Sequence, residues 1–178
     1  DELPNVVVID SRNLSNGQGQ VVAEACRLAR DCRDVAALCD ELRELTGRIE
    51  SSLLLNRLDY MVKGGRCSSA AALGANLLRL KPCIEVIDGR MKVTRKYRGD
   101  YAKCVGEYVS DRLAGRADIE TARLFAPHTA MPQATLAAFH KAVARAGKFD
   151  EVIHEHAGCT VCCHCGPSTV GLMLIRKK

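Results

Sequence analysis

The sequence predicts an α/β fold, in which a mixed β-sheet is flanked by helices. Short apolar, β-branched runs alternate along the chain with amphipathic helical patterns, and this alternation is typical of α/β proteins. Asp88-Gly89 separates two strand patterns and is a strong signal for a two-residue hairpin. A hairpin joins antiparallel strands whereas strand–helix–strand units join parallel ones, so the predicted sheet contains both directions.

The first quarter of the chain predicts one strand and two helices. The β-branched run at residues 5–10 predicts a buried strand. A loop with serine and glycine then leads to a helix at residues 20–30, whose apolar side chains fall on one side. Asp34 is placed to cap a second helix and Gly47 to end it.

The remaining chain continues to alternate. Strand-like patterns predict extended segments at residues 49–55, 83–87, 91–94, 119–125, 152–155 and 170–175. Helical periodicity predicts helices at residues 57–63, 68–80, 98–113 and 132–146. Gly64 and Gly65 end the first of these helices, Ser68 or Ser69 caps the next, and Pro82 forces an extended entry into the strand that follows.

Composition describes an ordinary globular protein with few aromatic residues. The 178 residues are 47% hydrophobic and 26% charged, with a formal net charge of +5. Only 4% are aromatic and none is tryptophan, so stacking surfaces for bases are poorly supplied. We therefore expect no nucleic-acid partner.

The chain carries no signal-peptide pattern and predicts no membrane-spanning helix. The uncharged run at residues 157–175 is nearly long enough to cross a bilayer, but Gly158, His164, Gly166 and Pro167 interrupt it. The cysteines outside this run stand in patterns typical of small, buried and reduced thiols. These features favour a cytoplasmic location.

Residues 159–165 concentrate four of the ten cysteines and one of the five histidines. Cys159, Cys162 and Cys165 repeat the C-x-x-C spacing that is found in zinc sites and in redox-active sites. A structural zinc site usually combines two ligand pairs separated by a loop, and a thioredoxin-like motif opens a helix. Here we expect an extended segment and a Gly-Pro turn that lead into a strand. A zinc-binding or redox role of this cluster is the alternative to the function inferred below.

Several short motifs occur along the chain in a defined order. They are Val8-Ile-Asp-Ser11 with Ser15-x-Gly17-x-Gly19, Leu58-Asp-Tyr-Met-Val-Lys-Gly-Gly-Arg66, Lys81-Pro82, Asp88-Gly89, Lys96-Tyr-Arg-Gly99 and His164-Cys-Gly-Pro-Ser168. The ordered set resembles the DegV family of fatty-acid-binding proteins, over the later part of the family's length. Two positions depart from the family pattern, because Cys165 replaces a usual threonine and Ser168 replaces a usual glycine. Serine adopts fewer backbone conformations than glycine, so we expect an unfavourable φ/ψ combination for Ser168 in this turn.

The resemblance implies a DegV-like fold and a binding protein that performs no chemistry itself. Residues 1–47 are then the remnant of an N-terminal α/β domain, and residues 48–178 form the C-terminal lipid-binding domain. A protein of this bacterial family binds a long-chain fatty acid as its ligand, without a cofactor, and presents the carboxylate to a separate fatty acid kinase. The mildly basic charge would also favour transient contact with an anionic membrane surface.

The resemblance assigns the fatty-acid head group to Arg66, His164 and Gly166. A buried carboxylate must be neutralised or hydrogen-bonded, which a guanidinium, an imidazole and backbone N–H groups around Gly166 can do. Taken alone, Arg66 would be solvated or cap a helix, and His164 would be a structural histidine. His128 and Thr129 follow a predicted strand and could line a cleft, but we interpret them as a plain loop.

An acyl chain needs a long apolar tunnel. The candidate tunnel residues are Leu54, Leu58, Leu73, Leu77, Leu80, Ile84 and Leu172. Burying about 14 methylene groups at ~0.8 kcal/mol each supplies roughly 11 kcal/mol before the losses of motion are subtracted. The same leucines suit an ordinary core, and the pattern does not separate a core from a tunnel.

Overall fold

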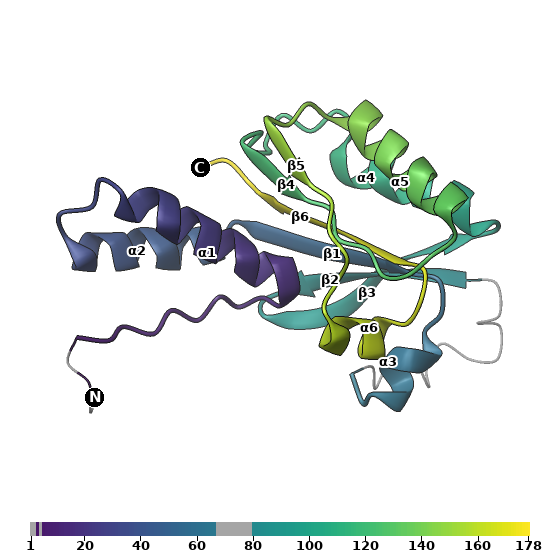
Figure 1. Cartoon of the computed structure of the whole chain (residues 1–178), viewed down its shortest axis with the longest axis horizontal. Coiled ribbons are helices and arrows are strands. Elements are labelled where there is room, and N and C mark those ends of the chain that lie inside the picture. Colours follow the sequence, from purple (N-terminus) through teal and green to yellow (C-terminus); the bar gives the residue numbers. More distant parts are fainter. Residues whose placement is uncertain (1–2, 4, 67–79) are drawn as a thin grey trace.

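A mixed six-stranded sheet forms the centre of the protein in the computed structural model, which describes residues 3, 5–66 and 80–178 (Figure 1). The strand order is β3-β2-β1-β6-β4-β5. The strands are β1 (Ile49–Leu55), β2 (Leu80–Ile87), β3 (Arg90–Arg98), β4 (Arg123–Phe125), β5 (Glu151–Ile153) and β6 (Thr169–Ile175). Only β4 and β5 pair in parallel among these neighbours, so the predicted mixed α/β sheet is confirmed.

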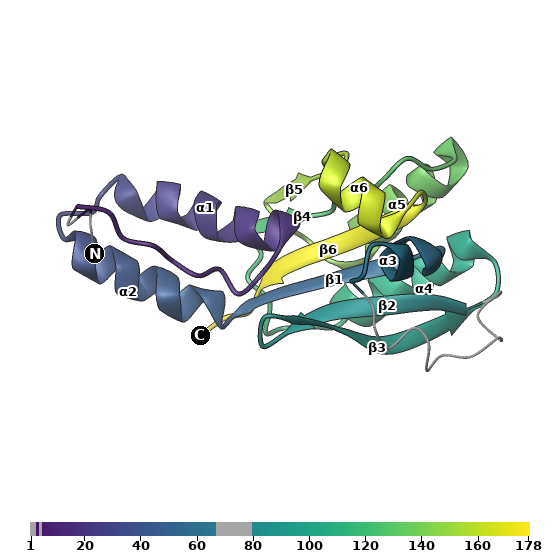
Figure 2. The same cartoon turned by 90° about the horizontal axis from the view of Figure 1, so that it is seen from below.

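Helices cover both faces of this sheet. They are α1 (Ser15–Ala29), α2 (Val35–Thr46), α3 (Asp59–Lys63), α4 (Tyr101–Leu113), α5 (Gln133–Ala146) and α6 (Cys159–Cys165). Figures 1 and 2 show α4 and α5 on one face, α3 and α6 on the other, and the α1–α2 pair projecting beyond the end of the sheet. Within the described residues, no helix combines the length and the hydropathy needed to cross a bilayer.

Alternating side chains of the strands build two apolar clusters. Leu54 points toward α4 and α5, into a core around the fully buried rings of Tyr108 and Phe139. Its neighbours Leu53 and Leu55 point to the opposite face. We call the cluster there the α3–α6 cluster; it consists of Leu53, Leu55, Leu58, Met61, Ile84, Phe125, Cys165 and Met173. The period of two along β1 therefore separates the chain's largest core from the face that carries α3 and α6.

Local sequence signals specify several of these elements correctly. The Asp34 carboxylate accepts a hydrogen bond from the Ala36 amide at 2.9 Å, so the predicted cap of α2 is confirmed. Asp88 and Gly89 have φ values of 54° and 73°, as the tight hairpin between β2 and β3 requires. Strand β1 has the predicted bounds, whereas the extended segment expected at residues 119–125 is shortened to β4.

Two predicted segments are wrong, and one is not described. Residues 5–10 form no strand, and Val8 is 85% exposed, because none of the described strands lies beside this run to pair with it. Residues 159–165 form helix α6 and not an extended segment. The helix expected at residues 68–80 lies outside the described residues, except for residue 80, which begins β2. The domain boundary at residue 47 stays a prediction.

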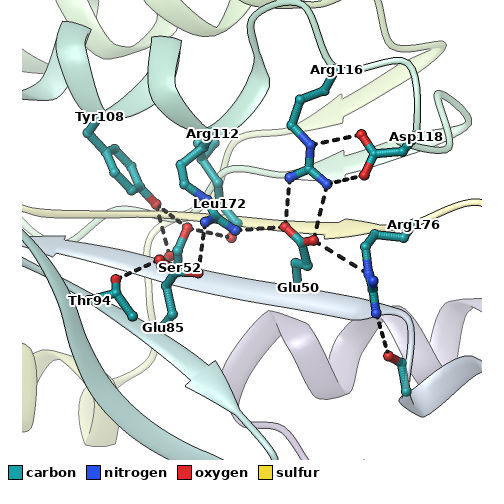
Figure 3. A network of polar contacts seen from close by, with 11 residues as sticks. Glu50, Ser52, Glu85, Thr94, Tyr108, Arg112, Arg116, Asp118, Leu172 and Arg176 are labelled. Atoms are coloured by element: carbon teal, nitrogen blue, oxygen red, sulfur yellow. Dashed lines mark hydrogen bonds and ion pairs between the residues drawn. The ribbon is translucent and has the colours of Figure 1, made fainter.

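A network of ion pairs anchors the C-terminal end of α4 to the sheet (Figure 3). Arg112 donates to Glu50 on β1 and to Glu85 on β2, both at 2.7 Å. Arg116 donates to Glu50 at 2.8 Å and to Asp118 at 2.5 Å. Glu50 is thus the carboxylate that joins α4 to the first strand, and its side chain is only 24% exposed.

The change Glu50→Gln tests this anchor. The neutral amide leaves Arg112 and Arg116 short of one charged partner, so we expect the free energy of unfolding to fall by about 1–3 kcal/mol. Urea unfolding near neutral pH measures the loss, with Glu41→Gln, an exposed position on α2, as the control. Equal stability of both variants would contradict the anchoring role.

Candidate functional site

The predicted head-group residues meet where α3 packs against α6. A Cβ atom on Gly64, at the end of α3, would overlap Nδ1 of His164. A Cβ atom on Gly166, at the end of α6, would overlap the ring of Tyr60 in α3. The two glycines therefore allow a close approach of motifs that lie about a hundred residues apart in the chain, and Figure 2 shows the two helices on the same face.

His164 is half-buried at this junction. Its Nδ1 atom is shielded from solvent and has no hydrogen-bond partner among the described residues. A buried nitrogen without a partner costs free energy, but this atom lies against Gly64, so a ligand group could reach it only if the neighbouring residues moved. Of the predicted head-group contacts, His164 is the one with a free polar atom in place.

Arg66 lies beside the same helix end but points elsewhere. Its Nη1 donates to the carbonyl of Gly64 at 2.8 Å, and its side chain is exposed. This is the helix-capping contact that the isolated residue would predict. The guanidinium would have to leave that carbonyl before it could pair with a carboxylate.

The turn after α6 uses its own backbone donors. Gly166 has φ 75° and donates its amide to Cys162 at 2.9 Å. The Ser168 amide donates to Ala130 at 2.8 Å. Neither amide is free for a carboxylate in this structure, which differs from the expectation of backbone donors around Gly166. Ser168 has φ 56°, as its departure from glycine predicted.

Two buried threonines, Thr129 and Thr169, hold this turn, a role that no signal in the sequence indicated. Thr129 donates its hydroxyl to the carbonyl of Gly166 at 2.8 Å and accepts from the amide of Thr169 at 2.9 Å. The hydroxyl of Thr169 donates to the carbonyl of Cys165 at 3.0 Å. Both residues are 2% exposed. Thr129 was predicted to belong to a plain loop, whereas its side chain clamps the end of α6 to the sheet.

The four cysteines of α6 do not form a metal site. Cys159 and Cys163 are exposed, Cys162 is half-buried, and Cys165 packs into the α3–α6 cluster. Among the described residues, no three His, Cys, Asp or Glu side chains are placed to hold a metal ion. Burial raises the pKa of Cys165 to about 11, and burial followed by Cys159 and Cys163 raises the pKa of Cys162. Protonated thiols are poor nucleophiles, so the geometry does not support the zinc or redox alternative.

The predicted tunnel residues are divided between the two faces of the sheet. Leu54 and Leu172 are buried in the core under α4 and α5. Leu58 and Ile84 belong to the α3–α6 cluster. Leu80 is half-buried at the start of β2, whereas Leu73 and Leu77 lie outside the described residues. The set therefore does not line one cavity, and only the α3–α6 face brings tunnel candidates close to His164.

Neither of two cavities found among the described residues has both the volume and the apolar lining that an acyl chain needs. An apolar pocket of about 10 Å³ lies beside α6, between residues that include Leu53, Thr129 and Val161. A cleft of about 370 Å³ lies at the opposite end of β1, and arginines and carboxylates line it. The small pocket has the apolar character that a lipid needs but not the volume, and the larger cleft is polar.

Comparison with known proteins gives one consistent family. The family model described as "Uncharacterised protein, DegV family" matches residues 1–177. A DegV domain-containing protein of Clostridium acetobutylicum is 33% identical over 178 residues, which are 99% of this chain and 61% of that protein. The chain thus spans about three fifths of the length of this curated relative.

Solved structures that share this fold include other proteins of the DegV family. The fatty-acid-binding DegV family protein of Thermus thermophilus has a TM-score of 0.80 and 26% identity, over 99% of this chain and 63% of that chain. The fatty-acid-binding DegV family protein of Streptococcus agalactiae has a TM-score of 0.79 and 27% identity, over 99% and 62%. The match of the family model to almost every residue, together with these likenesses, shows that the chain belongs to the DegV family.

Proposed function

We propose that this chain is the lipid-binding part of a fatty-acid-binding protein, with the fatty-acid carboxylate at the α3–α6 junction. The observation that carries the proposal is the buried, unpartnered Nδ1 of His164 at the meeting point of two DegV motifs. The DegV proteins of Thermus thermophilus and Streptococcus agalactiae, which share this fold, are described as fatty-acid-binding.

The residues around His164 supply the two environments that a fatty acid needs. The α3–α6 cluster is a buried apolar core, and the half-buried side chains of Met91, Val93, Ile153 and Val161 form its apolar border. The acyl chain would lie against this border, where each buried methylene contributes about 0.8 kcal/mol. His164 would donate a hydrogen bond to the carboxylate, and Arg66 would turn from Gly64 to neutralise it.

We further propose that the bound fatty acid is presented to a separate kinase subunit. Arg66 is exposed at the end of α3, so a head group held there stays within reach of a second protein. A carboxylate at this edge could accept a phosphoryl group without any catalytic side chain of this chain. We also propose that the protein is located in the cytoplasm and makes transient contact with anionic membrane surfaces.

Native mass spectrometry and a fluorescent fatty-acid binding assay test the proposal on the full-length protein. We expect a fatty acid to co-purify or to be taken up on incubation. His164→Ala and Arg66→Ala should each weaken binding roughly 10- to 100-fold, because each removes a hydrogen bond to a charged group. Arg57→Ala, an exposed arginine beside α3, serves as the matched control.

The outcomes separate the two parts of the proposal. A full-length protein that carries no fatty acid and takes none up would overturn the lipid-binding function. If the protein binds fatty acid but both variants bind as tightly as the wild type, the head-group assignment is wrong.

A further inference from the structure

Four of the five histidines gather beside β4 and β5, away from the fifth, His164. His128 follows β4, His140 lies on α5, and His154 and His156 follow β5. The ring centroids of His140 and His154 are 3.9 Å apart, at an interplanar angle of 40°. His128 is 5.5 Å from His156 and 6.3 Å from His140, both edge-to-face.

The stacked pair is built for the neutral form of imidazole. The Nε2 atom of His140 is buried without a hydrogen-bond partner among the described residues, and the ring of Phe139 lies 6.1 Å from His140 and 6.2 Å from His154. Burial, followed by His128, lowers the pKa of His140. Burial, followed by His140 and His128, lowers the pKa of His154, and the backbone of Ala126 partly opposes this shift.

Charged groups on the neighbouring elements are directed elsewhere. Glu155, between His154 and His156, accepts a hydrogen bond from Asn16. Glu151 on β5 and Glu24 on α1 both accept from Arg123 on β4. Lys141, the next residue of α5 after His140, is exposed. The charges that oppose protonation of the pair are therefore the other imidazoles of the cluster.

Hydrogen bonds connect the histidine cluster to both ends of α6. His128 donates from Nδ1 to the carbonyl of Thr129 at 3.1 Å, and Thr129 clamps Gly166. His156 donates from Nδ1 to the carbonyl of Ala157 at 3.0 Å, one residue before the N-cap of α6 at Gly158. The two strand extensions are themselves joined, since the amide of Ala157 donates to the carbonyl of His128 at 2.8 Å.

We propose that these four histidines form an acid-sensitive latch on the head-group site. In the neutral state the stacked pair holds α5 against the strand extensions, and these hold α6 in place. Protonation places like charges 3.9 Å apart at the stack. The rings separate, the segments through Thr129 and Ala157 shift, and the bound fatty acid is released at acidic pH. The effect on the ligand rests on the proposed function; the effect on the fold does not.

The direction of the pH effect follows from the lowered pKa values. Above the unfolded value of 6.5 neither state binds a proton at these residues, and the contribution of the pair to stability is fully present. As the pH falls below 6.5, the unfolded chain takes up protons that the folded protein resists, so stability is lost toward the lower pKa of the folded state.

The test compares wild type with His140→Phe, which keeps an aromatic ring at the stack but removes its charge. Between about pH 7.5 and about pH 5.5 we expect the fall in Tm to be at least about 3 °C smaller in the variant. Lys141→Gln, on the same helix, is the control and should behave as the wild type. Equal pH dependence of His140→Phe and wild type would overturn the latch.

Two further readouts at the same acidic pH locate the effect. Hydrogen exchange of the Gly166 amide, which bonds to Cys162, should be slower in His140→Phe than in the wild type. Fatty-acid affinity at about pH 5.5, relative to pH 7.5, should fall about tenfold in the wild type and less than about threefold in the variant.

Because the same pH change is applied to the wild type and the variant, the titration of the fatty acid itself cancels when the two affinity ratios are compared. Unchanged exchange at Gly166 would overturn the link to α6. If no fatty acid binds at either pH, the proposed function fails, while Tm and exchange still decide on the latch.

Discussion

Gly166→Ala is expected to abolish most fatty-acid binding and to lower the free energy of unfolding by about 2–4 kcal/mol. Gly166 has φ 75° and ψ 178°, a region almost restricted to glycine, where an L-residue costs roughly 1–3 kcal/mol. The added methyl group would also overlap the ring of Tyr60, so α3 and α6 would have to move apart. Because His164 stands in this contact, the proposed head-group site would open with it.

Fatty-acid affinity and urea unfolding of the same variant measure the two effects. Gly158→Ala is a matched control at the other end of α6, because Gly158 has φ −65° and nothing within 4 Å of an added Cβ. The double change Gly166→Ala with Tyr60→Ala should recover part of the stability, since it removes the overlap but not the strained φ. A Gly166→Ala protein as stable as Gly158→Ala would contradict the close packing of α3 and α6.

Thr129→Val should have the second largest effect, a loss of about 2–4 kcal/mol of stability and a measurable loss of fatty-acid affinity. Valine has the shape of threonine, but it leaves the buried Thr169 amide without its partner, and the Gly166 carbonyl keeps only the longer bond from the Thr169 hydroxyl at 3.2 Å. An unsatisfied buried group costs about 1–3 kcal/mol. The turn that places His164 and Gly166 would also lose its side-chain link to the segment after β4, although the backbone bond from Ser168 to Ala130 would remain.

Thr129→Ser separates the hydrogen bonds from the methyl packing, and it should retain most of the affinity. Thr160→Val, at an exposed position of α6, controls for the apolar substitution itself. Chemical denaturation and the binding assay give both quantities. Equal effects of the serine and valine variants would mean that the hydroxyl does not hold the turn.

The alternation of residue types along the chain was enough to predict the elements that short-range chemistry specifies. Asp34 caps α2, and Asp88-Gly89 makes the hairpin between β2 and β3. In each case the groups that determine the structure lie within a few residues of one another. Ordered motifs along the whole chain also led to the DegV family.

The same reasoning failed where a segment depends on a distant partner. The run at residues 5–10 has the composition of a strand, but a strand exists only when another strand pairs with its backbone. At residues 159–165 we predicted an extended segment whose closely spaced cysteines suggested metal chemistry, but these residues form helix α6. Their side chains face different surroundings, from solvent at Cys163 to the apolar cluster at Cys165.

For the candidate site, the motifs named His164, Gly166 and Arg66, but their arrangement depends on packing. Two glycines, Gly64 and Gly166, let α3 and α6 touch, which leaves His164 with a buried free nitrogen and Arg66 on the surface. The Thr129 clamp and the histidine cluster have no local signature, because each joins segments that are distant in sequence. Side-chain identity can be read along the chain, whereas burial, hydrogen-bond partners and mutual distance exist only after distant segments have packed together.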